Sequence, residues 1–332
     1  MTWPKLILNL CIITVVFSIS LGQAEKPPKL FPVRVKDKWG FIDPTGKLVI
    51  KPQFDDADQF SEGLASVRQG TRWFYINLRG QKVIVGTFSG SKWAVGGGEF
   101  SEGLASAPSG ENCAWGYIDR KGRQVIAPQF YSAGRFSDGL AAASLRTENA
   151  KDGFIDRAGR FVIDPRFDKA DDFSEGLAAV AINKKWGFID KLGRYIIGSG
   201  FDYAYKFSEG WAAILVKDKW GFIDHHGSFM IKPQFQGAED FSEGLAPVEV
   251  DGKWGYIDKT GTFVIPAQFS AARVFSGGLA RVSTAELDSK LNIIGSFECI
   301  EAWRWNVNGH LQYIDRSGRY VWKSSDPSST QP

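Results

Sequence analysis

Hydrophobic and aromatic residues in this chain occur in short runs that are separated by turn-forming polar residues. In residues 38–42 (KWGFI), an extended strand places Trp39 and Phe41 on one side and Ile42 on the other. A second apolar run follows at residues 48–50. Apolar residues on both sides indicate strands that are covered on both faces, as in a sheet between neighbouring sheets. The pattern therefore predicts an all-β protein of short antiparallel strands.

One turn pattern recurs eight times, with Asp or Asn at its first position and Gly at its fourth. Successive turns from Asp156 to Asp258 are 34 residues apart. An Asp side chain at the first position caps backbone N–H groups, and Gly at the fourth adopts the left-handed conformation. We read these acids as turn caps rather than metal ligands, because a calcium loop needs several oxygen donors close together. The predicted caps are Asp43, Asp119, Asp156, Asp190, Asp224, Asp258 and Asp315, with Asn77 in the second copy.

Each turn joins a Trp-containing strand to a following strand, and a third strand lies upstream. In one copy the upstream strand is residues 245–250, and Asp251-Gly252 forms a favoured two-residue hairpin connection to the Trp strand. The linker between copies carries an x-Pro-x-Phe step and then a Phe-Ser-Glu-Gly-Leu-Ala segment, where Gly permits a tight bend. We therefore predict a tandem repeat of about eight three- to four-stranded antiparallel β-meanders.

These motifs resemble the WG-repeat (KWG-type) proteins of bacteria, whose units carry the same three motifs in the same order. The resemblance covers residues 31–322. It implies a β-rich binding or surface role and supplies no catalytic residues. Three copies depart from the pattern and are expected to pack differently: they contain Trp73-Phe74, Asp152-Gly153 and Gln312-Tyr313 in place of Trp-Gly.

Sheets that are covered on both faces occur in β-propellers and in β-solenoids. We favour a propeller-like ring of seven or eight units. An open superhelical stack is the alternative, because a closed propeller usually shares one split unit between its two ends and the chain shows no obvious split unit. Large aromatic side chains remove about 150–250 Å² each from water, so we assign the repeated tryptophans to the core. These are Trp39, Trp115, Trp186, Trp220 and Trp254.

The N-terminus reads as a signal peptide over residues 1–24, with Lys5, an apolar stretch at 6–19 and a Gly22-x-Ala24 cleavage site. The apolar stretch is shorter than the roughly 20 residues of a membrane-spanning helix, and no later segment is long and apolar enough. We therefore expect a secreted or periplasmic protein without a membrane span in its mature chain. The predicted organisation is a linker at 25–30, the repeat domain at 31–322 with an insertion at 283–309, and a disordered tail at 323–332.

The charge balance of 40 basic and 37 acidic residues gives no basic stripe for nucleic acid. Two cysteines, Cys113 and Cys299, remain after signal cleavage, and whether they pair is open. The pair His225-His226 lies inside a turn, where exposed loop residues are expected. No nucleophile motif accompanies the histidines, so we predict no catalytic residue, no metal site and no cofactor.

Residues that break the repeat pattern are the predicted ligand-binding residues, because folding does not require them. One insertion, residues 89–98, carries Trp93, and the other carries Trp303-Arg304-Trp305, residue types that are enriched in binding hot spots. The second insertion has an alternative role as a cap for the array. We predict a non-catalytic extracytoplasmic scaffold for an unknown protein partner. The alternative is a carbohydrate or cell-wall binder that uses Trp93, Trp303 and Trp305, and a lesser alternative is a hydrolase with a loop-borne site.

Overall fold

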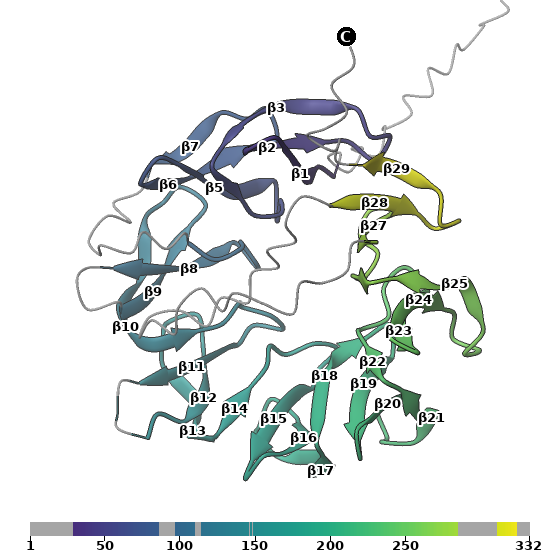
Figure 1. The fold of residues 1–332 in the computed structure, drawn as a ribbon. Helices are drawn as coiled ribbons and strands as arrows, with labels where there is room; N and C mark the ends of the chain where they lie inside the picture. Colours follow the sequence, from purple (N-terminus) through teal and green to yellow (C-terminus); the bar gives the residue numbers. More distant parts are fainter. Residues whose placement is uncertain are drawn as a thin grey trace, which may run out of the picture.

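The computed structural model describes residues 29–85, 97–109, 114–145, 147, 149–284 and 311–323. These residues form 29 strands in seven antiparallel sheets, and the sheets are arranged in a ring (Figure 1). None of the described residues belongs to a helix that could cross a bilayer. The chain is therefore a β-propeller, as the repeat pattern predicts.

The ring contains eight repeat units, each a meander of three or four strands. Units one to four contain β1 (Phe31–Val35), β2 (Lys38–Ile42) and β3 (Leu48–Phe54); β4 (Asp56–Ala57), β5 (Leu64–Gln69), β6 (Arg72–Asn77) and β7 (Lys82–Val85); β8 (Leu104–Ser109), β9 (Ala114–Asp119) and β10 (Gln124–Ala133); β11 (Ala141–Leu145), β12 (Asp152–Ile155) and β13 (Phe161–Phe167). Units five and six contain β14 (Lys169–Ala170), β15 (Ala178–Ile182), β16 (Lys185–Ile189) and β17 (Tyr195–Phe201); β18 (Tyr203–Ser208), β19 (Trp211–Val216), β20 (Lys219–Ile223) and β21 (Phe229–Phe235). Units seven and eight contain β22 (Gly237–Ala238), β23 (Ala246–Val250), β24 (Lys253–Ile257) and β25 (Phe263–Phe269); β26 (Ala271–Ala272), β27 (Leu279–Ser283), β28 (Gln312–Asp315) and β29 (Tyr320–Lys323).

Neighbouring units are joined by a nearly continuous extended segment. At five junctions the last strand of one unit is followed after one residue by the short first strand of the next, as from β3 to β4. Between the third and fourth units the two segments merge into β10, which pairs with both β9 and β11. For this reason these two units share one six-stranded sheet.

The glycine of the Trp-Gly motif lies where two strands approach most closely. Trp39 pairs with Phe54, but Phe41 pairs with Ile50, so the x-Pro-x segment between them bulges over Gly40. A Cβ atom on Gly40 would lie 2.5 Å from the Ile50 carbonyl oxygen and 2.7 Å from the Pro52 nitrogen. Only glycine fits such a contact without a backbone shift. The same close approach occurs at Gly116, Gly153, Gly187, Gly221 and Gly255.

The copies that lack this glycine pair differently, as expected for two of the three. In the second unit Phe74 pairs with Val85 and Tyr75 with Ile84, and in the eighth Gln312 pairs with Lys323 and Tyr313 with Trp322. The bulge at the Trp-Gly position is therefore missing, and a register shift remains only beside the Asp/Asn-x-x-Gly turn. The fourth unit keeps Gly153 and therefore keeps the bulge. There Asp152 replaces tryptophan, and its Oδ2 accepts a hydrogen bond from the Ala170 N–H at 3.0 Å. The glycine rather than the tryptophan thus determines the strand register.

The core is formed by the two residues after Trp-Gly and by the linker phenylalanines. Phe222 and Ile223 are fully buried, and Phe222 packs against Phe241 of the next unit with ring centroids 4.9 Å apart. Equivalent contacts between adjacent units recur around the ring, so each unit buries its aromatic residues against its neighbour. The predicted core tryptophans pack against these clusters but are only partly buried. Each lies at the strand end beside the hairpin that joins it to the preceding strand: Trp39, Trp115, Trp186, Trp220 and Trp254.

The first and last units meet and close the ring. The Phe31 and Tyr313 rings are 5.5 Å apart, and the Tyr313 hydroxyl donates to the Pro32 carbonyl at 3.0 Å. Val33 and Leu279 belong to the same buried cluster. Sheet β1-β2-β3 contains no strand from the C-terminal end of the chain, so closure depends on side-chain packing instead of a shared sheet. The open superhelical stack is therefore the wrong alternative.

Candidate functional site

Two kinds of turn lie at the same end of each unit from the second to the eighth and form one face of the ring. Leu64, which ends a Phe-Ser-Glu-Gly-Leu segment, pairs with Asn77 at the start of an Asp/Asn-x-x-Gly turn. The same relation holds between Leu279 and Asp315 in the eighth unit. We call this surface the turn face. It is where side chains of one unit contact the backbone of the next.

A glutamate-to-glycine contact links successive units on the turn face. Glu209 carries a positive φ of 53°, and its two carboxylate oxygens accept hydrogen bonds from the Gly244 N–H at 3.2 and 3.0 Å. Charge-assisted bonds of this kind are stronger than neutral ones. The contact occurs six times: Glu62 to Gly103, Glu102 to Gly139, Asp138 to Gly176, Glu175 to Gly210, Glu209 to Gly244 and Glu243 to Gly278. We call it the latch.

Several latches also have a basic or imidazole side chain nearby, from the second position of the next unit's Asp-x-x-Gly turn. His225 Nε2 lies 3.1 Å from Glu175 Oε2, and Lys259 Nζ lies 3.9 Å from Glu209 Oε2. In the first latch, Arg120 Nη2 donates to the Glu62 backbone oxygen at 2.7 Å. A serine hydroxyl adds a further bond to the next unit, for example from Ser208 to the Phe241 carbonyl at 2.6 Å. From the sequence we assigned the glycine of this segment to a tight bend, and we did not predict that the glutamate before it contacts the next unit.

The aspartates that open the Asp-x-x-Gly turns cap the backbone. Asp43 Oδ1 accepts hydrogen bonds from the Thr45 N–H at 2.9 Å and the Lys47 N–H at 3.1 Å. Donation from the Thr45 hydroxyl and these amides to the ionised form lowers the pKa of Asp43. The same backbone contacts occur at Asp119, Asp156, Asp190, Asp224, Asp258 and Asp315. In the described part of the chain, no group of three or more His, Cys, Asp or Glu residues is placed to hold a metal ion.

The series of latches is interrupted where the ring closes. The described segment before β1 contains Lys29-Leu30 instead of Phe-Ser-Glu-Gly, so within residues 29–54 the first unit has no glutamate at the position that would contact Gly63 of the second. Gly277 replaces the glutamate in the eighth unit, and a Cβ atom there would lie 2.6 Å from the Lys29 Cδ. Lys29 Nζ donates instead to the Ser276 hydroxyl. At the second position of the second turn, Leu78 replaces the cation.

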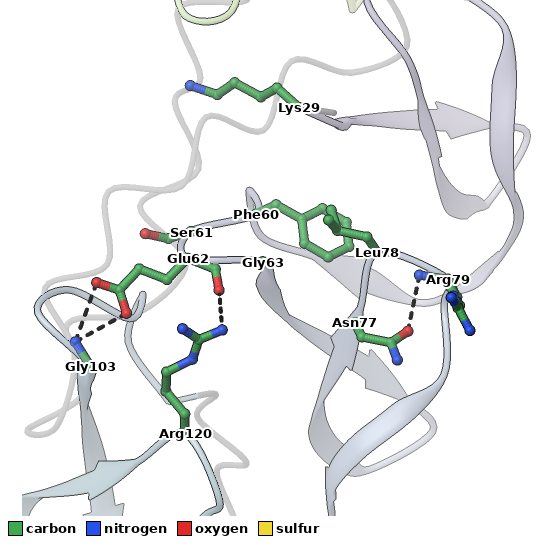
Figure 2. Close-up of a pocket in the computed structure, with 10 residues that line it drawn as sticks. All are labelled: Lys29, Phe60, Ser61, Glu62, Gly63, Asn77, Leu78, Arg79, Gly103 and Arg120. Atoms are coloured by element: carbon green, nitrogen blue, oxygen red, sulfur yellow. Dashed lines mark hydrogen bonds between the residues drawn. The ribbon is translucent and has the colours of Figure 1, made fainter. Parts of the chain in front are cut away.

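A hollow of about 1090 Å³ lies at this interruption. Figure 2 shows Gly63 at its centre, with Phe60 and Leu78 beside it and the Arg120 guanidinium below. Within the described residues we find no hydrogen-bond acceptor for the Gly63 N–H. The hollow is lined by Lys29, Phe60, Ser61, Glu62, Gly63, Asn77, Leu78, Arg79, Gly103 and Arg120.

The charge of this lining favours an anion. Among the described residues that line the hollow, Lys29, Arg79 and Arg120 contribute three cations, and Glu62 is the one acidic residue. Both carboxylate oxygens of Glu62 already accept from the Gly103 N–H. The lining therefore combines an excess of positive charge with an apolar wall.

A second distinctive surface is an aromatic cluster between the fifth and sixth units. Tyr203 lies 4.7 Å from Trp186 and 5.2 Å from Tyr205, and Tyr205 stacks on Trp220 at 5.2 Å with an interplanar angle of 20°. Tyr203 is 38% exposed, and burial raises the pKa of Tyr205 to about 12. The x-Pro-x-Phe step reads Gly-Ser-Gly-Phe before this cluster, a departure from the repeat that sequence reasoning did not weigh.

The residues predicted to bind ligand, Trp93, Trp303, Arg304 and Trp305, lie outside the described residues, as do Cys113 and Cys299. The structure brings together instead a hollow on the turn face and an aromatic cluster. Neither was predicted, because each depends on residues that are far apart in the sequence.

Comparisons with known proteins agree with the ring architecture. A crystal structure of a eukaryotic initiation factor is similar with a TM-score of 0.53 and 11% identity, over 89% of this chain and 85% of that chain. The structure of dihydro-heme d1 dehydrogenase NirN has a TM-score of 0.55 and 12% identity, over 90% and 73% of the two chains. At such identities the likeness concerns the fold alone. No curated protein matches the chain.

The model of the WG containing repeat matches residues 39–73, 115–146, 153–186, 186–220, 220–254 and 254–285. These ranges make up more than half of the chain, and they include the Trp-Gly strands whose bulge the structure explains. The chain belongs to the family of WG-containing repeat proteins.

Proposed function

We propose that the protein is an exported, non-catalytic scaffold that binds a protein partner on its turn face. The supporting observation is the interrupted latch. Six successive junctions satisfy the glycine N–H with a carboxylate of the neighbouring unit, whereas at Gly63 the described residues supply no acceptor and three cations line a hollow of about 1090 Å³. Sites for partners are commonly surfaces where a regular scaffold leaves groups that its own fold does not use.

A site-specific photo-cross-linker tests the binding role. It is placed at Arg79, which lines the hollow, and at Lys121, which holds the same turn position in the latched third unit. We expect a reproducible cross-linked protein from position 79 and little or none from position 121. Cross-links at neither position, in cells that produce the full chain, would contradict a partner at this face.

Export is tested separately by sequencing the N-terminus of the mature protein from the periplasm and from the medium. Cleavage after Ala24 would leave Glu25 as the first residue. Recovery of the intact N-terminus in the cytoplasmic fraction would remove export from the proposal and leave the binding role untouched.

The aromatic cluster favours a second candidate, carbohydrate binding. Partly exposed aromatic rings beside polar groups suit the apolar faces and hydroxyl groups of sugars. Titration with cell-wall glycan fragments should quench tryptophan fluorescence, and Tyr203→Ala should abolish the quenching. The matched control is Tyr195→Ala, because Tyr195 is similarly exposed at 40% but lies on the outer strand β17. Equal loss in both variants, or no quenching, would discard this candidate.

A further inference from the structure

The geometry of the receiving amide is the same in latched and unlatched units. Gly63 has φ of 77° after Glu62 at 50°, and Gly103 has φ of 78° after Glu102 at 51°. Backbone hydrogen bonds between Ser61 and Leu64 hold this turn in the second unit, and the same bonds join Ser101 and Leu104 in the third. The Gly63 N–H is therefore preorganised for a carboxylate, although the described residues of the preceding unit supply none.

The surroundings of Gly63 define what would occupy the site. The Arg120 Nη2 atom would lie 4.0 Å from a Cβ placed on Gly63, so a cation stands next to the receiving amide. Phe60 and Leu78 provide an apolar wall on the opposite side (Figure 2). The hollow of about 1090 Å³ has room for more than one side chain, which suits a peptide segment better than an isolated ion.

We infer that Gly63, with the cations of the hollow, receives the side-chain carboxylate of an acidic peptide segment from the partner, as a seventh latch formed between molecules. The inference rests on the proposed scaffold function and names the chemistry that its partner presents. A glutamate of the partner takes the place that Glu209 takes toward Gly244 within the ring.

The experiment follows the Gly63 amide by NMR in full-length protein labelled with ¹⁵N-glycine. The probe is a peptide capped at both ends with the sequence Phe-Ser-Glu-Gly-Leu-Ala, which copies residues 241–246, and its control carries Gln in place of Glu. We expect the Glu peptide to move the Gly63 resonance downfield in a saturable way and the Gln peptide to bind at least fivefold more weakly. Equal binding of the two peptides, or binding without a shift at Gly63, would overturn the inference.

Two variants sharpen the test. Leu78→Arg supplies the cation that other latches have and should tighten binding of the Glu peptide about tenfold. Arg79→Glu should weaken it about threefold, whereas the control Lys121→Glu in the latched third unit should change it less than twofold. If Leu78→Arg leaves the affinity unchanged, the site is not an open latch.

Two further outcomes separate the inference from the proposed function. A partner that cross-links to position 79 and keeps its affinity in Arg79→Glu and Leu78→Arg preserves the scaffold function and removes the carboxylate site. Peptide binding without any cellular partner would preserve the carboxylate site and remove the scaffold function. Binding that appears only in Glu25→Gln would assign the site to the chain's own N-terminal segment and overturn its assignment to a partner.

Discussion

The seventh and second units have the same meander but differ in both of the contacts that define the repeat. In the seventh unit Gly255 lies under the bulge before Phe269, and Gly244 receives the carboxylate of Glu209. In the second unit Phe74 replaces the glycine, and Gly63 receives no glutamate from the described residues. Both units nevertheless bury the next two residues of the strand completely or almost completely. The fold therefore depends on the buried aromatic and isoleucine pair, whereas the glycine and the glutamate adjust how neighbouring strands and units meet.

The largest expected effect is that of Gly255→Ala. The new Cβ would lie 2.6 Å from both the Ala267 nitrogen and the Ile265 carbonyl oxygen, so backbone must move. We expect the free energy of unfolding to fall by about 3 kcal/mol, measured by urea denaturation. The control is Gly198→Ala, because a Cβ there meets nothing within 4 Å. Similar losses in both variants would mean that the close approach under the bulge is not what requires glycine.

The sequence predicted those parts of the fold that depend on neighbouring residues. Asp43 caps atoms within four residues of itself, so spacing alone reveals it. The partner of Glu62 is Gly103, 41 residues away, and nothing in a single unit indicates that their atoms meet. The hollow could not be predicted for the same reason. It lies where Lys29-Leu30 replaces the Phe-Ser-Glu-Gly turn of the first unit, beside the normal turn of the second unit.

The tryptophans show a second limit of sequence reasoning. The size of Trp220 predicted a place in the core. The side chain does pack against a core cluster, but its position at a strand end leaves it partly exposed, and Tyr205 stacks on it. Area arguments rank how much a side chain gains from burial and do not locate it within the sheet. The strand position relative to the hairpin was therefore the better guide.

An effect of intermediate size on the free energy of unfolding is expected at Asp240 of the seventh unit. The second unit carries the neutral Gln59 at the corresponding position. Burial, with repulsion from Asp171 and Glu239, raises the pKa of Asp240 to about 7, although Lys206 opposes the shift. Among the described residues, Asp240 Oδ1 has no hydrogen-bond partner. Between about pH 4 and pH 7 the folded state holds a proton that the unfolded state has lost, so stability falls as the pH rises through this range.

Asp240→Asn should remove this loss. We expect the variant to be more stable than the parent by about 2 kcal/mol at pH 8 and nearly equal to it at pH 4, in urea denaturation at both pH values. A gain of the same size at pH 4 would show that the effect does not come from the charge. A loss at pH 8 would show that the ionised carboxylate has a stabilising partner.

The smallest expected effect concerns the latch that the second unit lacks. Glu209→Ala removes the acceptor for the Gly244 N–H and the ion pair with Lys259, so we expect a loss of about 1.5 kcal/mol in unfolding free energy. A double-mutant cycle with Lys259→Ala separates the two contacts, and the pair of exposed charges should account for about 0.5 kcal/mol of the loss. Since salt screens the ion pair more than the short amide bond, the coupling should shrink in 1 M NaCl while most of the single-mutant loss persists. If the coupling accounts for the whole loss, the glutamate acts through lysine alone, and an open amide at Gly63 would then have little affinity for a carboxylate.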